Sequence, residues 1–381
     1  MNEKYTINRL IEPQIREKLF RGRAIIVVGP RRVGKTTLLK QIASDIDPEH
    51  LWLDCDEPDI RSMLTDATST RLKAIIGKAK MVVIDEAQRI QNIGITLKLI
   101  VDQISNTQLL VSGSSALELS NEINEPLTGR KYDFELHPFS YAELEAHYGA
   151  LHERRLLENR LVYGSYPDVV NHPSEEVILL NELSQSYLYK DLFSYQEIRK
   201  PDLLPRLLEA LALQVGSEVV VYELAQTLGV DSETIRRYID LLEKTFVVFS
   251  LKSLSRNVRN ELKKSRKIYF YDNGIRNSII RNFQPTSLRT DVGALWENYL
   301  VSERRKANSI NGRYASTWFW RTTQQQEIDY LEDQDGLLKA FEFKWNSKAK
   351  AKFPKTFTSN YPTHELMLVN PDTYQEFLQE V

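Results

Sequence analysis

The chain has 381 residues, of which 42% are hydrophobic and 27% are charged, and its formal net charge is −2. This length is enough for about two to three globular domains, and the composition is that of an ordinary soluble protein. The single cysteine, Cys55, excludes an internal disulfide framework and a cysteine-based zinc site, and it fits a reducing cytosol. The near-zero net charge means that any surface for nucleic acid must be a local patch.

The hydropathy of the sequence argues against a membrane protein and against a secreted protein. No apolar run approaches the roughly 18 residues that a membrane helix needs. The N-terminal residues lack the apolar core of a secretory signal. We therefore expect a cytoplasmic protein that has no membrane partner.

A glycine-rich motif lies between a predicted strand at 24–28 and a predicted helix from 37 onward. Its residues 29–36, Gly-Pro-Arg-Arg-Val-Gly-Lys-Thr, fit the phosphate-binding pattern G-x-x-x-x-G-K-[ST]. A strand, glycine loop and helix in this order aim backbone N–H groups at an anion. Lys35 would reach the β- and γ-phosphates, and the Thr36 hydroxyl would bind Mg²⁺. The alternative is a glycine-rich turn in an unrelated α/β domain. The predicted nucleotide contacts are Gly29, Pro30, Arg31, Arg32, Val33, Gly34, Lys35, Thr36 and Thr37.

Two carboxylates end the next strongly apolar strand, at 81–86. Ligands of doubly wound sheets bind at the carboxyl ends of the strands, so we expect Asp85 and Glu86 beside the glycine-rich loop. Asp85 would bind Mg²⁺ through water, and Glu86 would orient and polarise the attacking water. The alternative is a pair of acids at a solvated strand end.

Two further positions are candidates for sensing the nucleotide. Ser114 follows a predicted strand that starts at 108, where its hydroxyl could contact the γ-phosphate; a plain turn is the alternative. Arg130 could act as an arginine finger across a subunit interface, or it is a surface arginine in a loop. The chain lacks an Asn-Lys-x-Asp guanine-reading motif, so ATP is preferred over GTP.

A helix-rich segment at 141–215 precedes a predicted helix-turn-helix at 221–239, with Gly229 in the turn. A strand from 246 follows, which indicates a winged helix. Arg236 and Arg237 could face a DNA groove; the alternative is a packing or oligomerisation module. The basic residues of 256–267 could form a phosphate-contacting wing or a solvated loop. These are Arg256, Arg259, Lys263, Lys264, Arg266 and Lys267.

Four charged residues in the last quarter of the chain form an ordered set. Glu297 lies in a predicted helix, Asp329 in a strand, and Glu342 and Lys344 on one face of a strand at 341–345. Asp329 and Glu342 could share Mg²⁺, with Glu297 completing the metal site and Lys344 polarising the attacking water or the phosphate. The alternatives are an inert scaffold and a plain charged sheet. Four lysines follow that would suit a phosphate backbone, namely Lys348, Lys350, Lys352 and Lys355.

Several of these motifs together resemble the prokaryotic AAA+-type ATPases that carry a DUF4143 C-terminal region. They are Gly-Pro-Arg-Arg-Val-Gly-Lys-Thr-Thr-Leu-Leu, Ile-Asp-Glu-Ala-Gln, Ser-Gly-Ser-Ser, and Leu-Thr-Gly-Arg followed by His-Pro-Phe-Ser-Tyr. The resemblance implies an AAA+ core, ATP hydrolysis and ring-like self-association. The set around Asp329 is similar to the PD-(D/E)xK nuclease fold, especially its Holliday-junction-resolvase-like branch.

We therefore predict an α/β fold: an AAA+ P-loop doubly wound sheet, a helical and winged-helix segment, and a PD-(D/E)xK-like domain. The expected function is ATP hydrolysis with Mg²⁺, coupled to action on DNA by a metal-dependent nuclease-like domain in a homo-oligomer. The alternative is an ATP-dependent oligomerisation or signalling switch with an inert nuclease fold. A small-molecule P-loop kinase is a weaker possibility. The predicted domains are 1–140, 141–215, 216–285 and 286–381.

Overall fold

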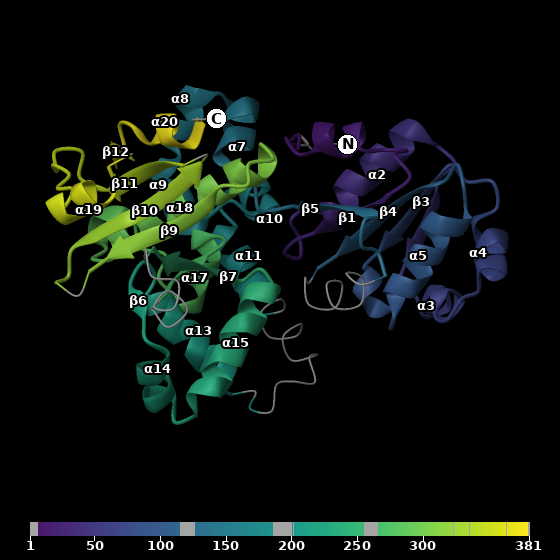
Figure 1. Cartoon of the computed structure of the whole chain (residues 1–381), viewed down its shortest axis with the longest axis horizontal. Coiled ribbons are helices and arrows are strands. Elements are labelled where there is room, and N and C mark those ends of the chain that lie inside the picture. Colours follow the sequence, from purple (N-terminus) through teal and green to yellow (C-terminus); the bar gives the residue numbers. More distant parts are fainter. Residues whose placement is uncertain are drawn as a thin grey trace. The chain divides into compact units, whose positions relative to one another are not determined.

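The computed structural model describes residues 7–114, 126–185, 200, 202–254, 266–322, 324–334, 336–362 and 364–379. The chain divides into two compact units, which are described separately (Figure 1). The first comprises Met1–Pro138 with Lys244–Phe246, and the second comprises Phe139–Glu243 with Val247–Val381.

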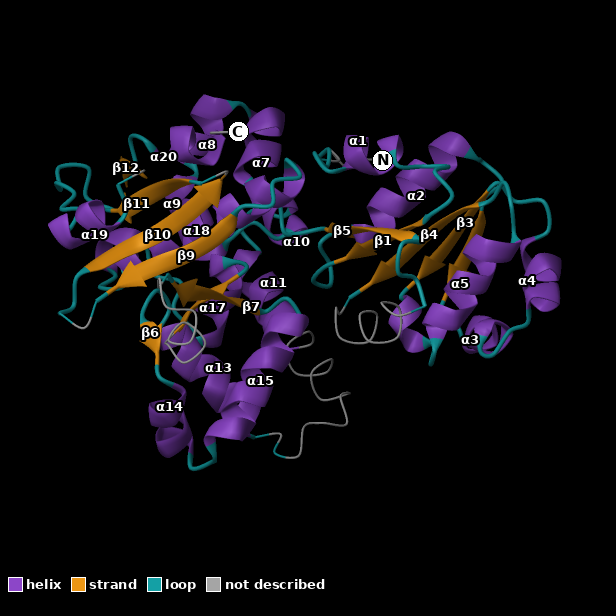
Figure 2. Cartoon of the chain, in the orientation of Figure 1, coloured by secondary structure: helices purple, strands orange, loops and turns teal. Residues whose placement is uncertain are grey.

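The first unit is built on a five-stranded sheet with the order β2-β3-β4-β1-β5, in which every neighbouring pair is parallel. Its strands are short apolar runs, as expected when both faces of a parallel sheet are covered. Figure 2 shows helices on both faces of this sheet. Its elements are α1 (Glu12–Glu17), β1 (Ala24–Val28), α2 (Lys35–Ile46), β2 (Leu51–Asp54), α3 (Pro58–Leu64), α4 (Ser69–Ile76), β3 (Met81–Asp85), η1 (Ala87–Arg89), α5 (Ile93–Gln103), β4 (Gln108–Gly113) and β5 (Lys131–Glu135).

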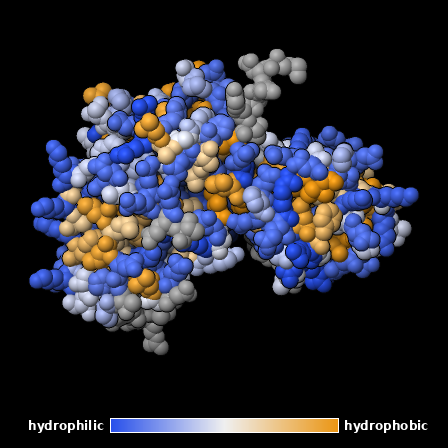
Figure 3. All heavy atoms as spheres, turned by 90° about the horizontal axis from the view of Figure 1, so that it is seen from above, coloured by the Kyte–Doolittle hydropathy of each residue, from blue (hydrophilic) through white to orange (hydrophobic). Residues whose placement is uncertain are grey.

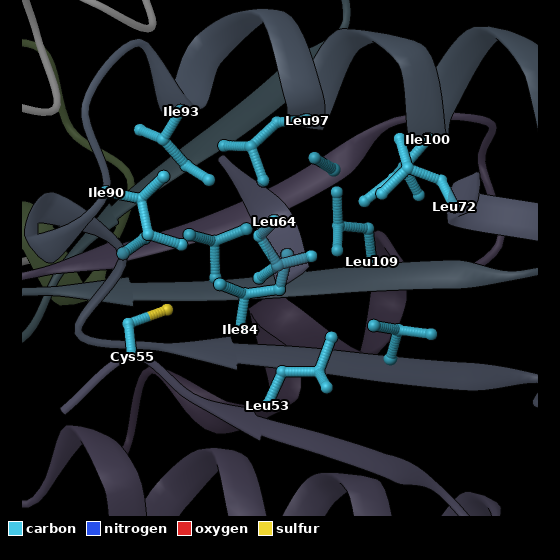
Figure 4. Packing of buried hydrophobic residues seen from close by; sticks show 14 of the residues in the cluster. Leu53, Cys55, Leu64, Leu72, Ile84, Ile90, Ile93, Leu97, Ile100 and Leu109 are labelled. Atoms are coloured by element: carbon cyan, nitrogen blue, oxygen red, sulfur yellow. The ribbon is translucent and has the colours of Figure 1, made fainter. Parts of the chain in front are cut away.

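Alternate strand residues build the core on one face of this sheet. Leu53, Ile84 and Leu109 come from β2, β3 and β4, and they pack with apolar residues of α3, α4 and α5 (Figure 4). Because successive strand residues point to opposite faces, the intervening residues are left for the other face, where α2 contacts β3 and β4. The sheet is thereby fixed between two apolar layers, and its carboxyl edge carries the loops of the candidate site.

The second unit contains a seven-stranded mixed sheet with the order β12-β11-β10-β9-β7-β8-β6. The 19-residue helix α18 contacts β8 and β11 of this sheet. Its elements are α7 (Tyr141–Tyr148), α8 (Ala150–Arg155), α9 (Leu157–Tyr163), α10 (Pro167–Asn171), α11 (Glu176–Leu183), α13 (Leu203–Leu213), β6 (Glu218–Val219), α14 (Val221–Leu228), α15 (Ser232–Lys244), β7 (Val248–Ser253), β8 (Arg266–Phe270), α17 (Asn273–Ile279), η3 (Thr286–Leu288), α18 (Val292–Ile310), β9 (Ser316–Arg321), β10 (Glu327–Gln334), β11 (Leu337–Phe343), α19 (Lys355–Asn360), β12 (His364–Val369) and α20 (Tyr374–Gln379).

One sheet therefore runs through the two C-terminal segments that the sequence suggests as separate domains. Strands β6, β7 and β8 come from the 216–285 segment, and β9 to β12 come from 286–381. They are joined where β7 pairs in parallel with β9, Lys252 opposite Trp318. The strand predicted at 341–345 ends at Phe343, although the Lys344 N–H still donates to the Val369 carbonyl, at 2.9 Å.

The Gly-Ser-Tyr-Pro turn at 164–167 packs against the Asp-Asn-Gly turn at 272–274. Gly164 has a φ of +72°, and a Cβ there would lie 2.0 Å from a carboxylate oxygen of Asp272. The same carboxylate accepts a hydrogen bond from the Ser165 N–H at 2.7 Å. A Cβ on Gly274 would lie 2.1 Å from the Tyr163 carbonyl oxygen. These glycines are thus required by close approach within the fold, and both turns have a structural role.

Hydrophilic residues cover most of the face shown in Figure 3, with apolar patches between them. Within the residues that the structure describes, no helix is long and apolar enough to cross a membrane. Of the predicted basic wing, Arg256, Arg259, Lys263 and Lys264 lie outside the described residues.

Candidate nucleotide site and C-terminal acidic cluster

The glycine-rich loop leaves the end of β1 and turns directly into α2. Gly29 has a φ of +151°, and a Cβ there would lie only 2.0 Å from the Leu136 carbonyl oxygen. Gly34, with a φ of 96°, is the N-cap of α2. The loop is anchored by Val33, which is buried, while Arg32 and Thr37 are exposed. This arrangement leaves the first N–H groups of a 12-residue helix at the mouth of the loop, where they can bind an anion.

Lys35 lies across the same loop. Its ammonium donates to the carbonyl oxygens of Gly29, at 2.8 Å, and Pro30, at 2.7 Å. The side chain is only 5% exposed, so most of its length is packed and its charged end is held at the loop. From this position the ammonium can contact a phosphate that the loop binds.

Asp85 links the loop to two strands. Its Oδ2 accepts a hydrogen bond from the Thr36 hydroxyl at 2.9 Å, and its Oδ1 accepts one from the Ser112 hydroxyl on β4. Ser112 also accepts from the Glu86 N–H at 3.0 Å. Glu86 adopts the left-handed conformation, with a φ of 53°. A hydroxyl and a carboxylate are thus brought together beside a phosphate-binding loop, and these are the hard oxygen ligands that Mg²⁺ prefers.

Ser114 and Glu86 are joined through Gln88 in η1. The Gln88 amide Nε2 donates to the Glu86 carboxylate and, at 2.8 Å, to the Ser114 hydroxyl. Sequence reasoning missed Gln88 and Ser112. Both lie inside segments that carry the family resemblance, Ile-Asp-Glu-Ala-Gln and Ser-Gly-Ser-Ser. Their place in these two segments is the feature of the sequence that could have identified them.

The carboxyl edge of the sheet is strongly acidic. Burial raises the pKa of the Cys55 thiol to about 12, and the nearby carboxylates of Asp54, Asp85, Asp56 and Glu86 raise it further in the same direction. Cys55 is therefore an inert core residue. The concentration of negative charge is suited to attracting a divalent cation to this edge.

Arg130 lies at the opposite edge of the same sheet. It directly precedes β5, whose first residue, Lys131, pairs with Ala24 at the start of β1. The five residues of β1 span roughly 16 Å between the two edges. Arg130 Nε instead donates to Asp102 Oδ1 at 2.7 Å, and its side chain is 40% exposed. Within one copy of the domain, Arg130 is therefore remote from the P-loop.

The structure brings three of the four predicted C-terminal site residues together, with Lys344 between Asp329 and Glu342. Lys344 Nζ lies 2.9 Å from Glu342 Oε2 and 3.7 Å from Asp329 Oδ2. Asp329 Oδ2 also accepts from the Phe343 N–H at 2.8 Å. Burial, reinforced by the negative charge of Asp329, raises the pKa of Glu342 to about 7.

Glu297 is engaged by a buried lysine that sequence reasoning placed in the basic wing. Lys267 is 1% exposed, so it is not a surface residue as predicted, and its Nζ lies 2.8 Å from Glu297 Oε1 and 2.6 Å from Glu327 Oε1. The Tyr269 hydroxyl donates to the same Glu297 oxygen at 2.7 Å. Burial raises the pKa of Glu297 to about 7 even though Lys267 acts to lower it. Among the described residues, no three His, Cys, Asp or Glu side chains are arranged to hold a metal ion.

Comparison with known proteins agrees with the geometry of the first unit. Residues 21–145 match an AAA domain family, residues 154–286 match a domain of unknown function (DUF8612), and residues 292–381 match a domain of unknown function (DUF4143). The chain is similar to an uncharacterized protein of Mycobacterium tuberculosis, with 27% identity over 338 residues, 88% of this chain and 73% of the relative. It is also similar to an uncharacterized protein of Haemophilus influenzae, with 25% identity over 291 residues, 67% of this chain and 68% of the relative.

Among solved structures, the chain resembles a Walker-type ATPase of Pyrococcus abyssi. The TM-score is 0.53 and the identity 15%, over 73% of this chain and 97% of the other. At this identity the likeness concerns the fold alone. Together with the family matches, it supports the expected α/β fold with a P-loop ATPase domain. The chain thus carries an AAA-type ATPase domain in its first part and a DUF4143 domain at its end.

Proposed function

We propose that the first unit binds ATP with Mg²⁺ and hydrolyses it. The observation that carries this proposal is the junction at Asp85, which accepts from Thr36 of the P-loop and from Ser112 of β4. The backbone N–H groups of 29–37, except at Pro30, and the Lys35 ammonium would hold the phosphates, and Thr36 and Asp85 would hold the metal. When bound, Mg²⁺ neutralises charge on the phosphates. Glu86 would orient the attacking water, and Ser114 would contact the γ-phosphate.

The direct test is phosphate release by the purified chain. We expect ATP hydrolysis with Mg²⁺, loss of hydrolysis on addition of EDTA, and recovery when excess Mg²⁺ is restored. GTP is expected to be the poorer substrate. Tight nucleotide binding that does not depend on a divalent metal, with no turnover, would contradict the roles given to Thr36 and Asp85.

We further propose that the active form is a homo-oligomer in which Arg130 serves a neighbouring copy. The support is the place of Arg130 at the edge of the sheet opposite the P-loop, where a side chain of the same copy is remote from the phosphates. The exposed Arg130 guanidinium is held by a surface ion pair with Asp102 and by a long hydrogen bond to the Thr128 carbonyl, at 3.4 Å. It is easily released, because such surface contacts contribute little free energy.

Arg130→Ala should retain ATP affinity and lose turnover by ~10³-fold, because an arginine finger stabilises charge that develops in the transition state. Steady-state hydrolysis and nucleotide titration measure the two effects. Arg71→Ala, which removes an exposed arginine on α4, is the matched control. Mixing Arg130→Ala with Lys35→Ala protein should restore some activity, since one copy then supplies the finger and the other the P-loop. A strict monomer in sedimentation with ATP present would overturn the proposal.

For the second unit we propose action on DNA. The order α13, β6, α14, α15, β7 and β8, with β8 between β6 and β7, supports a winged helix-turn-helix. The exposed face of α15 carries Arg236 and Arg237 but also Glu233 and Asp240, so it has no net positive charge. The exposed lysines at 348, 350, 352 and 355 are the better support for contact with a phosphate backbone.

Metal-dependent cleavage of that DNA is a second candidate function. The favouring observation is the contact of Lys344 with both Asp329 and Glu342. Mg²⁺ is commonly bound by only one or two carboxylates together with substrate phosphates, so these two residues would fit it without a third acid. Glu297, held by Lys267, would orient the surrounding groups, and Lys344 would stabilise charge on the phosphate. The alternative is a nuclease-like domain that binds partners without cleaving them. The ion pairs of the buried Lys267 with Glu297 and Glu327 support this alternative.

A further inference from the structure

Gln88 makes more contacts to the hydrolysis machinery than its place two residues after Glu86 suggests. Its Nε2 donates to the Glu86 carboxylate and to the Ser114 hydroxyl, the second at 2.8 Å. Its Oε1 accepts from the Ser114 N–H at 3.4 Å. The amide therefore uses both of its N–H donors and its acceptor on two residues to which the proposed mechanism gives roles.

The contacts at the two ends of the amide require the same orientation. A backbone N–H can only donate, so the atom facing Ser114 N is the amide oxygen; an ionised carboxylate can only accept, so the atom facing Glu86 is the amide nitrogen. A flipped amide would lose both contacts. Gln88 is thus locked in one orientation by Ser114, directly after β4, and by Glu86, directly after β3.

The backbone of Glu86 is fixed, but its side chain depends on Gln88. The Glu86 N–H donates to Ser112, and the left-handed φ of 53° sets the direction in which the side chain leaves the strand. Within the described part of the chain, Gln88 is the one side chain that hydrogen-bonds to the Glu86 carboxylate. A general base acts only when it is held within reach of the water proton, so the carboxylate needs this support.

We propose that Gln88 is a positioning residue for ATP hydrolysis, which fixes the Glu86 carboxylate and couples its orientation to the Ser114 hydroxyl. This inference rests on the proposed ATPase function. Because Gln88 acts through Glu86 and not on the nucleotide, its loss should slow turnover and leave nucleotide binding intact. A residue that merely supported the fold would change both.

The first measurement is steady-state hydrolysis by Gln88→Ala, together with nucleotide titration. We expect kcat to fall by about 10- to 100-fold, as for a catalytic group displaced by about 1 Å, with KM and ATP affinity within about 2-fold of wild type. Gln88→Glu keeps the shape of the side chain and the acceptor for the Ser114 N–H but loses the donor to Glu86. Its kcat should therefore fall at least as far as that of Gln88→Ala. Gln91→Ala, which removes an exposed amide three positions along the chain, should hydrolyse at the wild-type rate.

The decisive measurement is a double-mutant cycle. Gln88→Ala added to Glu86→Gln should cause no further loss of kcat, because residues that act as a unit are non-additive. Independent, multiplying losses, a wild-type rate in Gln88→Ala, or a loss of ATP affinity as large as the loss of rate would each overturn the inference. Failure of the ATPase proposal itself looks different: the wild-type chain would not hydrolyse ATP, or Glu86→Gln would retain the full rate.

Discussion

Lys35→Ala should nearly abolish ATP binding, whereas Glu86→Gln should bind ATP and fail to hydrolyse it. Lys35 is buried at the loop, from where it would supply charge-assisted hydrogen bonds to the phosphates, and its loss should weaken binding by roughly 100-fold or more. Glu86, directly after β3, would act on the attacking water and not on the phosphates, so its loss should cost about 10²- to 10⁴-fold in kcat at unchanged affinity.

Nucleotide titration and phosphate release on the same preparations separate the two effects. Lys40→Ala is the matched control, because Lys40 lies on the same helix, is exposed, and packs its ammonium over the Trp52 ring at 4.9 Å. It should bind and hydrolyse ATP as the wild-type chain does. Equal loss of binding in Lys35→Ala and Glu86→Gln would mean that Glu86 is structural.

The local parts of the nucleotide site could be predicted from the sequence. A β-branched run, two glycines and a lysine at fixed spacing determine a strand, a turn and a helix start within about a dozen residues, and the structure has β1, the loop and α2 there. The carboxyl-edge rule for doubly wound sheets then places Asp85 beside the loop, where it contacts Thr36.

The contacts that cross between strands could not be predicted in the same way. Ser112 hydrogen-bonds to Asp85, 27 positions away in the chain, and Gln88 hydrogen-bonds to Ser114, 26 positions away. Neither residue stands at a spacing in the sequence that predicts its contact. The remoteness of Arg130 follows only once the pairing of β1 with β5 is known. Strand order, not local pattern, decides which loops share an edge of the sheet.

The second unit shows a different limit of sequence reasoning. Lys267 counts as one of a basic run in the sequence, but the strand that contains it, β8, has the burial pattern of a core strand. Its ammonium is satisfied by Glu297 and Glu327, which come from elements far along the chain. A buried lysine needs such partners, and the sequence gives no indication of where they lie.

The second prediction with a large expected effect concerns the C-terminal cluster of Glu297, Asp329, Glu342 and Lys344. Asp329→Ala should end metal-dependent DNA cleavage and weaken Mn²⁺ or Mg²⁺ binding, while ATP hydrolysis persists. Lys344→Ala should end cleavage too, but leave metal binding largely in place. The reason for the contrast is that Asp329 would supply a negative ligand, whereas Lys344 would act on the phosphate. Asp333→Ala, which removes another acid from the same strand β10, is the control and should cleave normally.

The assay combines branched and linear DNA with the purified chain, with and without Mg²⁺ and ATP. Metal titration by calorimetry is done on Lys35→Ala protein, so that the C-terminal cluster is measured with the ATP site disabled. Loss of cleavage in both variants, with weaker metal binding in Asp329→Ala alone, would assign the two roles. If the Lys35→Ala protein binds no divalent metal and cleaves no DNA, then Lys267 and Lys344 neutralise these acids in place of a metal, and the domain serves as a partner-binding scaffold under the control of ATP.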